Sequence, residues 1–421
     1  MTALPEIPGP LVVPADPPDA CVYGVDFWLC YVANALLLVA VSVLFRYADF
    51  VLFFGGSERQ LGMIVGVGMI GALAARLFLG VGIDRYGPRR IWLLSLALFV
   101  IAMGLHLVVT TMQSPLVYVA RILMMTGIAG SVGSAFTYIS LRVAAPRIAE
   151  IVGILGTSGF LGMAIGPTLG DLLFHGNAVT RMQVTRMFCL AALMGVLAMV
   201  SAGLATRAAV RVPDRGTPPP FWQLVWRYQP GTVLLVAAAL GLAVGLPRIF
   251  LRAFTADRHI HGIMIFFLVY AAVAIVVRVT TRRLPERLGL HRVILIGLVV
   301  QSISMLFYLV VYHPWQLAIP AMAAGSAHAL LFPSIVAAGA ISFPSRYRGL
   351  ATTLMFGMLD VGNLIGQPAI GNGLYLAQRI GWPRYPTMFI GVTILMLSIT
   401  VIFAARQTRT DNTRSTSAGP P

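Results

Sequence analysis

Two stretches of this sequence decide its fold: RLFLGVGIDRYGPRR, from Arg76 to Arg90, and RVTTRRLPERLGLHR, from Arg278 to Arg292. A constant offset of 202 residues matches Arg76, Asp84, Arg85, Gly87 and Arg90 of the first stretch with Arg278, Glu286, Arg287, Gly289 and Arg292 of the second. Each stretch joins two long apolar segments. Charges and glycines matched at one spacing indicate a duplicated unit, so we expect two homologous halves with a shared site between them.

The composition on either side of these stretches is that of a membrane protein. Hydrophobic residues make up 58% of the 421 positions and charged residues only 10%, whereas a soluble domain carries about 25% charged residues. All 30 basic residues are Arg, and with 14 acidic residues they give a net charge of +16. Because these charges lie between apolar segments and not in one patch, the expected partner is a lipid bilayer with an anionic surface, not nucleic acid.

A helix needs about 20 apolar residues to cross the ~30 Å core of a bilayer. On this basis the spans are expected at 26–45, 60–79, 91–111, 116–141, 148–174 and 184–206, and again at 231–254, 262–281, 293–312, 315–341, 349–376 and 386–405. We predict an all-α membrane protein with twelve transmembrane helices in two pseudo-symmetric six-helix bundles, 26–206 and 230–405. A cytoplasmic tail (1–25), a proline-containing cytoplasmic linker (207–229) and a disordered C-terminal tail (406–421) complete the chain.

The distribution of Arg predicts the orientation in the membrane. With both termini inside, the inner loops and tail hold 18 Arg residues, and the outer loops and outer helix ends hold 9. Cytoplasmic loops collect basic residues, so this ratio favours cytoplasmic termini in a multi-pass protein, expected as a monomer in a bacterial inner membrane. The remaining three, Arg76, Arg121 and Arg278, lie within spans.

The first loop resembles the signature loop of the major facilitator superfamily, a glycine, then Asp-Arg, then a glycine and paired basic residues. The residues that carry the resemblance are Gly80, Asp84, Arg85, Gly87, Arg89 and Arg90. It implies a transporter whose two halves are latched in the outward-facing state, with Asp84 facing the cytoplasmic end of the eleventh helix near Gly349. A carboxylate is favourable at a helix N-terminus. The alternative is that these charges only enforce the topology.

The second loop departs from this pattern. Glu286 and Arg287 match Asp84 and Arg85, but Arg282 and Leu284 stand where the first copy has glycines. A latch role for the second loop is therefore in doubt.

The fifth span carries a stripe of small residues and reads GILGTSGFLGMAIGPTLGD from Gly153. Gly162, Gly166 and Gly170 follow one another at four-residue spacing, with Pro167 beside them, which lets another helix approach closely. The stripe resembles the GxxxGPxxGG motif of the family's exporters, with Asp171 in place of the last glycine. The resemblance implies packing on the eighth helix and favours export, and packing without directional meaning is the alternative. The eleventh span echoes the stripe with Gly362, Gly366, Pro368 and Gly371.

Ionisable side chains within spans are costly and are therefore candidate sites. Arg121 stands where the family's proton-coupled exporters carry an Arg, so it is a candidate for coupling or for recognising substrate charge; snorkelling or structural pairing is the alternative. His328 and Asp360 are both near mid-depth on sequence-adjacent helices, and we expect them to be neighbours that exchange a proton or bind a cationic group. The alternative is a structural hydrogen bond with Asn363 or a hydroxyl.

No enzyme or metal constellation is apparent in the sequence. Cys21, Cys30 and Cys189 are too scattered for a disulfide framework or a metal site, and nothing resembles a nucleotide-binding loop. We therefore expect no cofactor and no enzymatic activity. The predicted function is secondary transport of a small solute by alternating access, with proton-coupled efflux favoured. The alternatives are proton-coupled uptake of a small organic solute and a receptor or scaffold that no longer transports.

Overall fold

The computed structural model describes residues 23–56, 58–174, 179–207, 221–260 and 264–417. The first bundle contains α1 (Val25–Val43), η1 (Leu44–Arg46), α2 (Tyr47–Phe53), α3 (Glu58–Tyr86), α4 (Pro88–Leu107), α5 (Pro115–Ser140), α6 (Ile148–Leu173) and α7 (Arg181–Ala205). The second contains α9 (Thr232–Asp257), α10 (Met264–Thr280), α12 (Leu290–Phe307), α13 (Ala318–Ser342), α14 (Arg348–Arg379) and α15 (Arg384–Ser417). Two short helices, α8 (Phe221–Tyr228) and α11 (Leu284–Leu288), lie in connecting segments.

The helices are long and apolar enough for a membrane. Ten of those in the described ranges meet the length and hydropathy of a complete span. α3 is an eleventh, although its parts Met63–Arg76 and Phe78–Tyr86 differ in direction by 41°. The shorter apolar helix α10 takes the twelfth place. The prediction of an all-α membrane protein with twelve spans in two bundles is confirmed.

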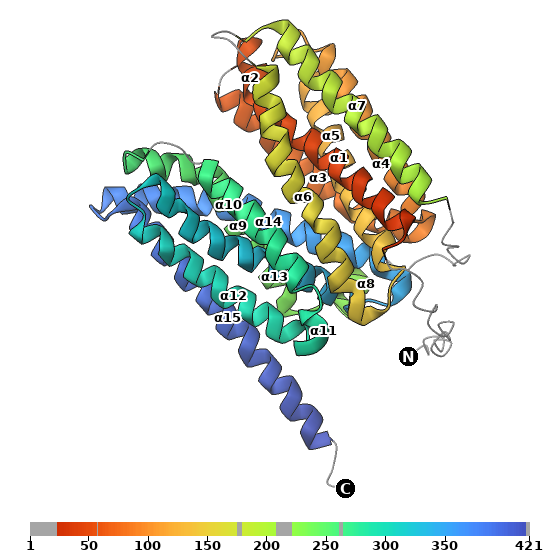
Figure 1. Cartoon of the computed structure of the whole chain (residues 1–421), viewed down its shortest axis with the longest axis vertical. Coiled ribbons are helices and arrows are strands. Elements are labelled where there is room, and N and C mark those ends of the chain that lie inside the picture. The colour runs from red at the N-terminus through yellow and green to blue at the C-terminus, as the bar shows by residue number, and fades with distance from the viewer. Residues whose placement is uncertain (1–22, 57, 175–178, 208–220, 261–263, 418–421) are drawn as a thin grey trace.

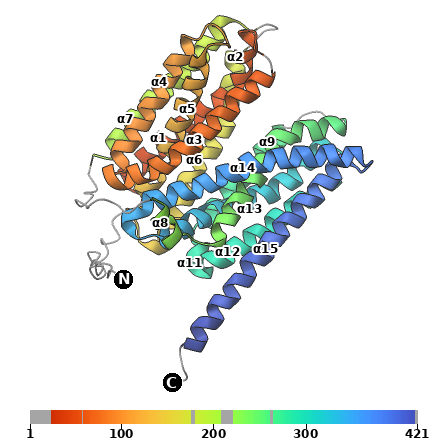
Figure 2. The ribbon, with the colours of Figure 1, turned by 180° about the vertical axis from the view of Figure 1, so that it is seen from behind.

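The two bundles lie side by side and meet at one end of the molecule (Figure 1). This end carries α8 and α11, and we call it the inner end. The bundles diverge toward the opposite end, the outer end, which carries α2 (Figure 2). The start of α1 and the end of α15 both lie on the side of the inner end.

Each bundle repeats the same close packing of one glycine-bearing helix on another. In the first, Gly162 and Gly166 of α6 lie against Leu38 and Ser42 of α1; in the second, Gly362 and Gly366 of α14 lie against Ala238 and Leu242 of α9. Adding 200 to each residue number of the first set gives the second. The predicted duplication is thus visible in matched contacts, and glycine is needed there because an added Cβ would collide with the facing helix.

This packing corrects the expected partner of the stripe on the fifth span. The stripe was expected to face the eighth span, which is α10, but Gly162, Gly166 and Gly170 all face α1 and η1 of their own bundle. α6 meets α10 through another face, where Gly156 contacts Arg278. The side chains of Pro167 and Asp171 lie outside the described residues. The spacing predicted a close helix contact correctly, but it does not specify which neighbour makes it.

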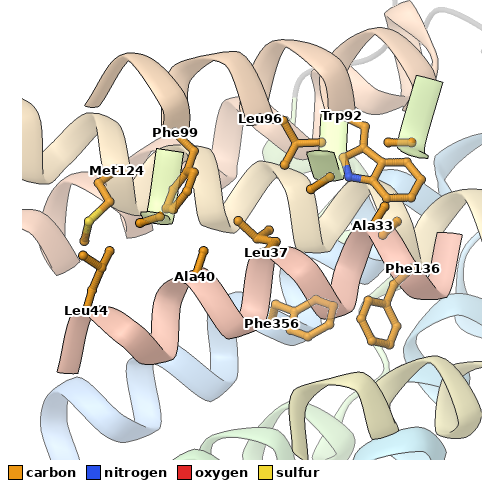
Figure 3. Packing of buried hydrophobic residues seen from close by; sticks show 14 of the residues in the cluster. Ala33, Leu37, Ala40, Leu44, Trp92, Leu96, Phe99, Met124, Phe136 and Phe356 are labelled. Carbon is orange, nitrogen blue, oxygen red and sulfur yellow. The ribbon is translucent and has the colours of Figure 1, made fainter. Parts of the chain in front are cut away.

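The core of the first bundle forms around α1. Ala33, Leu37 and Ala40 of α1 and Leu44 of η1, which follows it directly, recur every three or four residues and therefore lie on one face. This face is directed at Trp92, Leu96 and Phe99 of α4 and at Met124 of α5 (Figure 3). Apolar side chains of α1, α4 and α5 thereby share one continuous core.

Two segments outside the bundles contain helix. The linker contains α8, whose Leu224 is buried with Phe343 and Tyr347 at the inner ends of α13 and α14. The tail at 406–421, predicted to be disordered, continues α15 as far as Ser417. Extending an existing helix costs far less than nucleating one, which accounts for helix in a polar sequence. Residues 1–22, 208–220 and 418–421 lie outside the described ranges.

Candidate transport site and inner gate

An ion pair joins the two bundles about halfway along their helices. Nε of Arg76 on α3 donates to Oδ2 of Asp360 on α14 at 2.6 Å. The Arg76 side chain is 11% exposed and that of Asp360 is 41% exposed. Nη1 of Arg76 is buried without a hydrogen-bond partner. Asp360 thus compensates a buried cation of the other bundle, and neutralising Asp360 would leave that cation uncompensated.

A cavity of about 130 Å³ lies beside this ion pair. Its walls are mostly apolar, with Met69 and Leu73 from α3, Met125 from α5 and Leu364 from α14. Met69 precedes Arg76 on α3 and Leu364 follows Asp360 on α14, and both directions lead to the outer end. The cavity therefore lies on the outer side of the ion pair, where the bundles diverge.

Three aromatic rings from both bundles pack together on the inner side of the ion pair. Phe136 of α5 lies 5.2 Å from Phe356 of α14 and 5.7 Å from Phe332 of α13, measured between ring centroids. The guanidinium of Arg76 lies 5.8 Å from the centroid of Phe356. Figure 3 shows Phe136 and Phe356 next to one another below α1. These rings separate the cavity from the inner end.

The inner end is held by Asp84, the last acidic residue of α3. Its Oδ1 accepts from the backbone N of Gly349 at 2.7 Å, and its Oδ2 accepts from that of Leu350 at 2.9 Å. The first amides of a helix have no partner within the helix, and the N-terminus attracts negative charge. A Cβ on Gly80 would lie only 3.0 Å from Cα of Leu350, so glycine permits this approach. The predicted contact of Asp84 with the start of the eleventh span is present, and we call it the inner latch.

Replacing Asp84 by Ala should shift the protein toward forms that are open at the inner end. A carboxylate at a helix N-terminus contributes about 1–2 kcal/mol when partly buried, so the population ratio should change by about 5- to 30-fold. Spin labels at positions 90 and 292, both exposed at the inner end, would report longer distances in Asp84→Ala. The control is Glu286→Ala in the matched loop, which should leave the distances unchanged; an unchanged distribution in Asp84→Ala as well would contradict a latch.

In a second contact between the bundles, the acidic residue lies at the start of a helix and the basic residue lies in a loop. Glu150, in the first turn of α6 and 1% exposed, lies 3.9 Å from Nε of Arg282 in the other bundle. It also accepts from Nε of Arg147 at 3.0 Å and from the Tyr23 hydroxyl at 2.6 Å. Burial and the hydrogen bond to Glu150 raise the pKa of Tyr23. Here the acid is on the helix and the base on the loop, so the second loop also contacts the other bundle, through Arg282.

The other residues of the two loops contact their own bundle or are exposed. Gly87 and Gly289 have φ of +86° and +82°, a region that favours glycine, and each precedes the next helix. Nη1 of Arg89 donates to the carbonyl of Thr206 at 2.9 Å. The remaining charged side chains of the two loops are exposed: Arg85, Arg90, Arg283, Glu286, Arg287 and Arg292.

The expected contact between His328 and Asp360 is wrong. Asp360 pairs with Arg76, whereas Nδ1 of His328 shares a hydrogen bond with the Tyr270 hydroxyl. The two side chains lie on faces of α13 and α14 that are turned to different neighbours, α10 and α3. Asn363 is bound elsewhere, accepting from Nε2 of Gln367 at 3.1 Å.

Arg121 does not line the cavity. Its guanidinium lies 4.5 Å from the ring centroid of Tyr47, and its Nε is buried without a hydrogen-bond partner. The structure therefore places Arg121 within the first bundle, between α5 and the start of α2.

Sequence reasoning missed Arg76 and Glu150 as site residues. A signal for Arg76 was available, because it lies within a span and matches Arg278 at the same offset as the loop residues. Glu150 gave no comparable signal, since an acid at the start of a helix is common and its partner is more than a hundred residues away.

The chain is similar to known membrane transporters over most of its length. The family model of the Major Facilitator Superfamily matches residues 27–284 and 233–420. An uncharacterised transporter of this type from Escherichia coli K12, YhhS, is 24% identical over 353 residues, 81% of this chain and 82% of YhhS.

Solved structures share the fold at 14% identity. FucP in the outward conformation gives a TM-score of 0.75 over 91% of this chain and 99% of FucP. A bacterial homologue of the iron transporter ferroportin, in the outward-facing state, gives 0.72 over 90% and 99%. From its family match and its fold, the chain belongs to the major facilitator superfamily and is a multi-pass membrane transporter of a small solute.

Proposed function

We propose that this protein exports a small solute in exchange for protons, with Asp360 as the group that carries the proton. The observation behind the proposal is the Arg76–Asp360 ion pair, which links the bundles at the inner side of the outer cavity. An ionisable carboxylate at such a position can bind a proton from the cavity. Protonation would remove the charge that compensates Arg76 and so weaken the link between α3 and α14.

Exchange follows if the ion pair is opened from the outer side by a proton and from the inner side by the solute. The bundles then change orientation only when either a proton or the solute is bound, which is the requirement for coupling. The stripe around Gly162 and Gly166 packs on α1 and not on the eighth span, but its sequence resembles an exporter motif, and this resemblance supports the outward direction of solute movement.

We further propose that the inner end faces the cytoplasm of a bacterial cell. The excess of Arg in the loops assigned to this side supports the orientation. The bundles at 26–206 and 230–405 would act as the two moving units of a monomer.

The proposal is tested with the purified chain in liposomes that contain a pH-sensitive dye. Liposomes are loaded with members of a panel of organic anions, sugars, amino acids and drugs, and the outside is acidified. For a solute that is carried, exchange predicts faster acidification of the lumen together with loss of the loaded compound. Acidification that requires the compound on the outside would indicate uptake instead, and no proton movement with any compound would contradict coupled transport.

A further inference from the structure

Arg278 is a buried cation without an acidic partner. It lies on α10, is 3% exposed, and forms no ion pair among the described residues. Its Nη1 and Nη2 donate to the carbonyls of Gly153 at 3.4 Å and His328 at 3.5 Å, both long for such bonds. Its Nε has no hydrogen-bond partner. A guanidinium remains charged in proteins, and burying it unpaired is costly.

The matched position in the other half shows what is missing. Arg278 corresponds to Arg76, and Arg76 is paired with Asp360. Under the shift of 200 that relates the packing of α6 to that of α14, Asp360 corresponds to Phe160. The guanidinium of Arg278 lies 4.8 Å from the ring centroid of Phe160 and 5.0 Å from that of Phe332. An aromatic ring thus stands where the other half supplies a negative charge.

The space beside Arg278 lies on the inner side of the molecule. A cavity of about 10 Å³ is bounded by Gly153 of α6, by Arg278 of α10, by Thr281 and Arg282 after that helix and by Pro285 of α11. Thr281, Arg282 and Pro285 follow Arg278 toward the inner end. The two matched Arg residues therefore border spaces on opposite sides, Arg76 the outer one and Arg278 the inner one.

We propose that Arg278 binds the anionic group of the exported solute, a carboxylate, phosphate or sulfonate. The inference rests on the proposed function, because α6 and α10 belong to different bundles and would separate when the inner end opens. Gly153 and Phe160 would then leave Arg278, and its guanidinium would face the cytoplasm. The face of Phe332, which belongs to the same bundle as Arg278, suits an apolar or aromatic body, and Arg282, 41% exposed at the entrance, attracts anions by its charge.

The test is anion-dependent thermal unfolding of the purified full-length chain. Sodium benzoate, sodium phosphate and sodium chloride are compared with benzylamine hydrochloride at matched ionic strength. Benzoate should stabilise the wild type, and Arg278→Gln should weaken its binding by about 10- to 100-fold, the range for a hydrogen-bonded charge. Arg278→Lys, which keeps the charge, should retain part of the response.

The matched control is Arg258→Gln. Arg258 also donates to a backbone carbonyl, that of Val311 at 3.3 Å, and lies 4.7 Å from the ring centroid of Tyr312, but it is at the outer end. It should leave benzoate binding unchanged. An anion response that is absent, or that is the same in Arg278→Gln as in the wild type, would overturn the inference. Stabilisation by chloride without benzoate would overturn the assignment to the solute and indicate an inorganic ion.

Stability without ligand gives a second result that does not depend on the choice of anion. Because Arg278 has only long hydrogen bonds to carbonyls and no acidic partner among the described residues, Arg278→Gln should unfold at the same temperature as the wild type or at a higher one. A lower temperature would show that its carbonyl and ring contacts are structural and would contradict the site. Failure of proton exchange in the liposome assay, with anion binding intact, would refute the proposed coupling alone.

Discussion

Asp360→Asn is expected to abolish proton-coupled transport while the protein still folds. Asn has nearly the same shape and can still accept a hydrogen bond from Arg76, but it cannot bind and release a proton. Proton flux driven by a carried solute should fall by at least about tenfold, because an essential ionisable group is lost. Asp360→Glu keeps a carboxylate and should retain part of the flux. The measurement is the rate of lumenal acidification in liposomes.

The chain offers a matched control for this substitution. Asp26 is 40% exposed and pairs with Arg142 at 2.7 Å, close to the 41% and 2.6 Å of Asp360 with Arg76. It lies at the start of α1, away from the cavity, so Asp26→Asn should leave proton flux near the wild-type rate. Full proton-driven transport in Asp360→Asn would exclude Asp360 as the coupling group.

Gly362→Ala is expected to lower stability strongly. The added Cβ would collide with the carbonyl oxygen of Ala238 on α9, and the backbone there can only respond by moving α14 away. Overpacking costs about 1–3 kcal/mol, and a collision with three backbone atoms of Ala238 belongs at the upper end of that range, above the ~1 kcal/mol that Ala gains over Gly in a helix. The midpoint of thermal unfolding in detergent should therefore fall.

Substitutions of two other glycines give the comparisons that test this prediction. Gly371, on the same helix, has nothing within 4 Å of an added Cβ, so Gly371→Ala should be neutral or stabilising by about 0.4–1 kcal/mol. Gly162 is the counterpart of Gly362 in the first bundle, and its added Cβ would lie 2.7 Å from the carbonyl carbon of Leu38. Gly162→Ala should therefore also destabilise. If Gly362→Ala and Gly371→Ala behaved alike, the packing of α14 on α9 would be wrong.

Much of the architecture could be predicted because its causes are local or repeated in the sequence. Span length and apolar composition are read directly from the chain. The duplication appears as matched residues, and the contact between Asp84 and the start of α14 follows from charge and the free amides of a helix end. These features do not depend on how each helix is rotated about its axis.

Two of the errors share one physical origin, the rotation of each helix. The number of residues from the helix ends predicts a similar membrane depth for His328 and Asp360. The rotation of α13 and α14 about their axes decides their partners, which are Tyr270 for His328 and Arg76 for Asp360. The glycine stripe of α6 predicted a close neighbour and not which one. The second loop was doubted as a latch because its glycines are replaced, and the structure shows that Arg282, one of the replacements, forms the contact with Glu150.

The two contacts at the inner end differ in distance and exposure, and this gives them different responses to ionic strength. Asp84 is held by short hydrogen bonds to two backbone amides, whereas Glu150 and Arg282 interact over 3.9 Å through a side chain that is 41% exposed. Dissolved ions screen exposed charges over a Debye length of about 10 Å at 0.1 M salt and about 3 Å at 1 M, and they screen partly buried pairs much less. Raising the salt concentration would therefore weaken the contact of Glu150 with Arg282 before the contact of Asp84 with α14. The inner end would then open first on the side of Arg282.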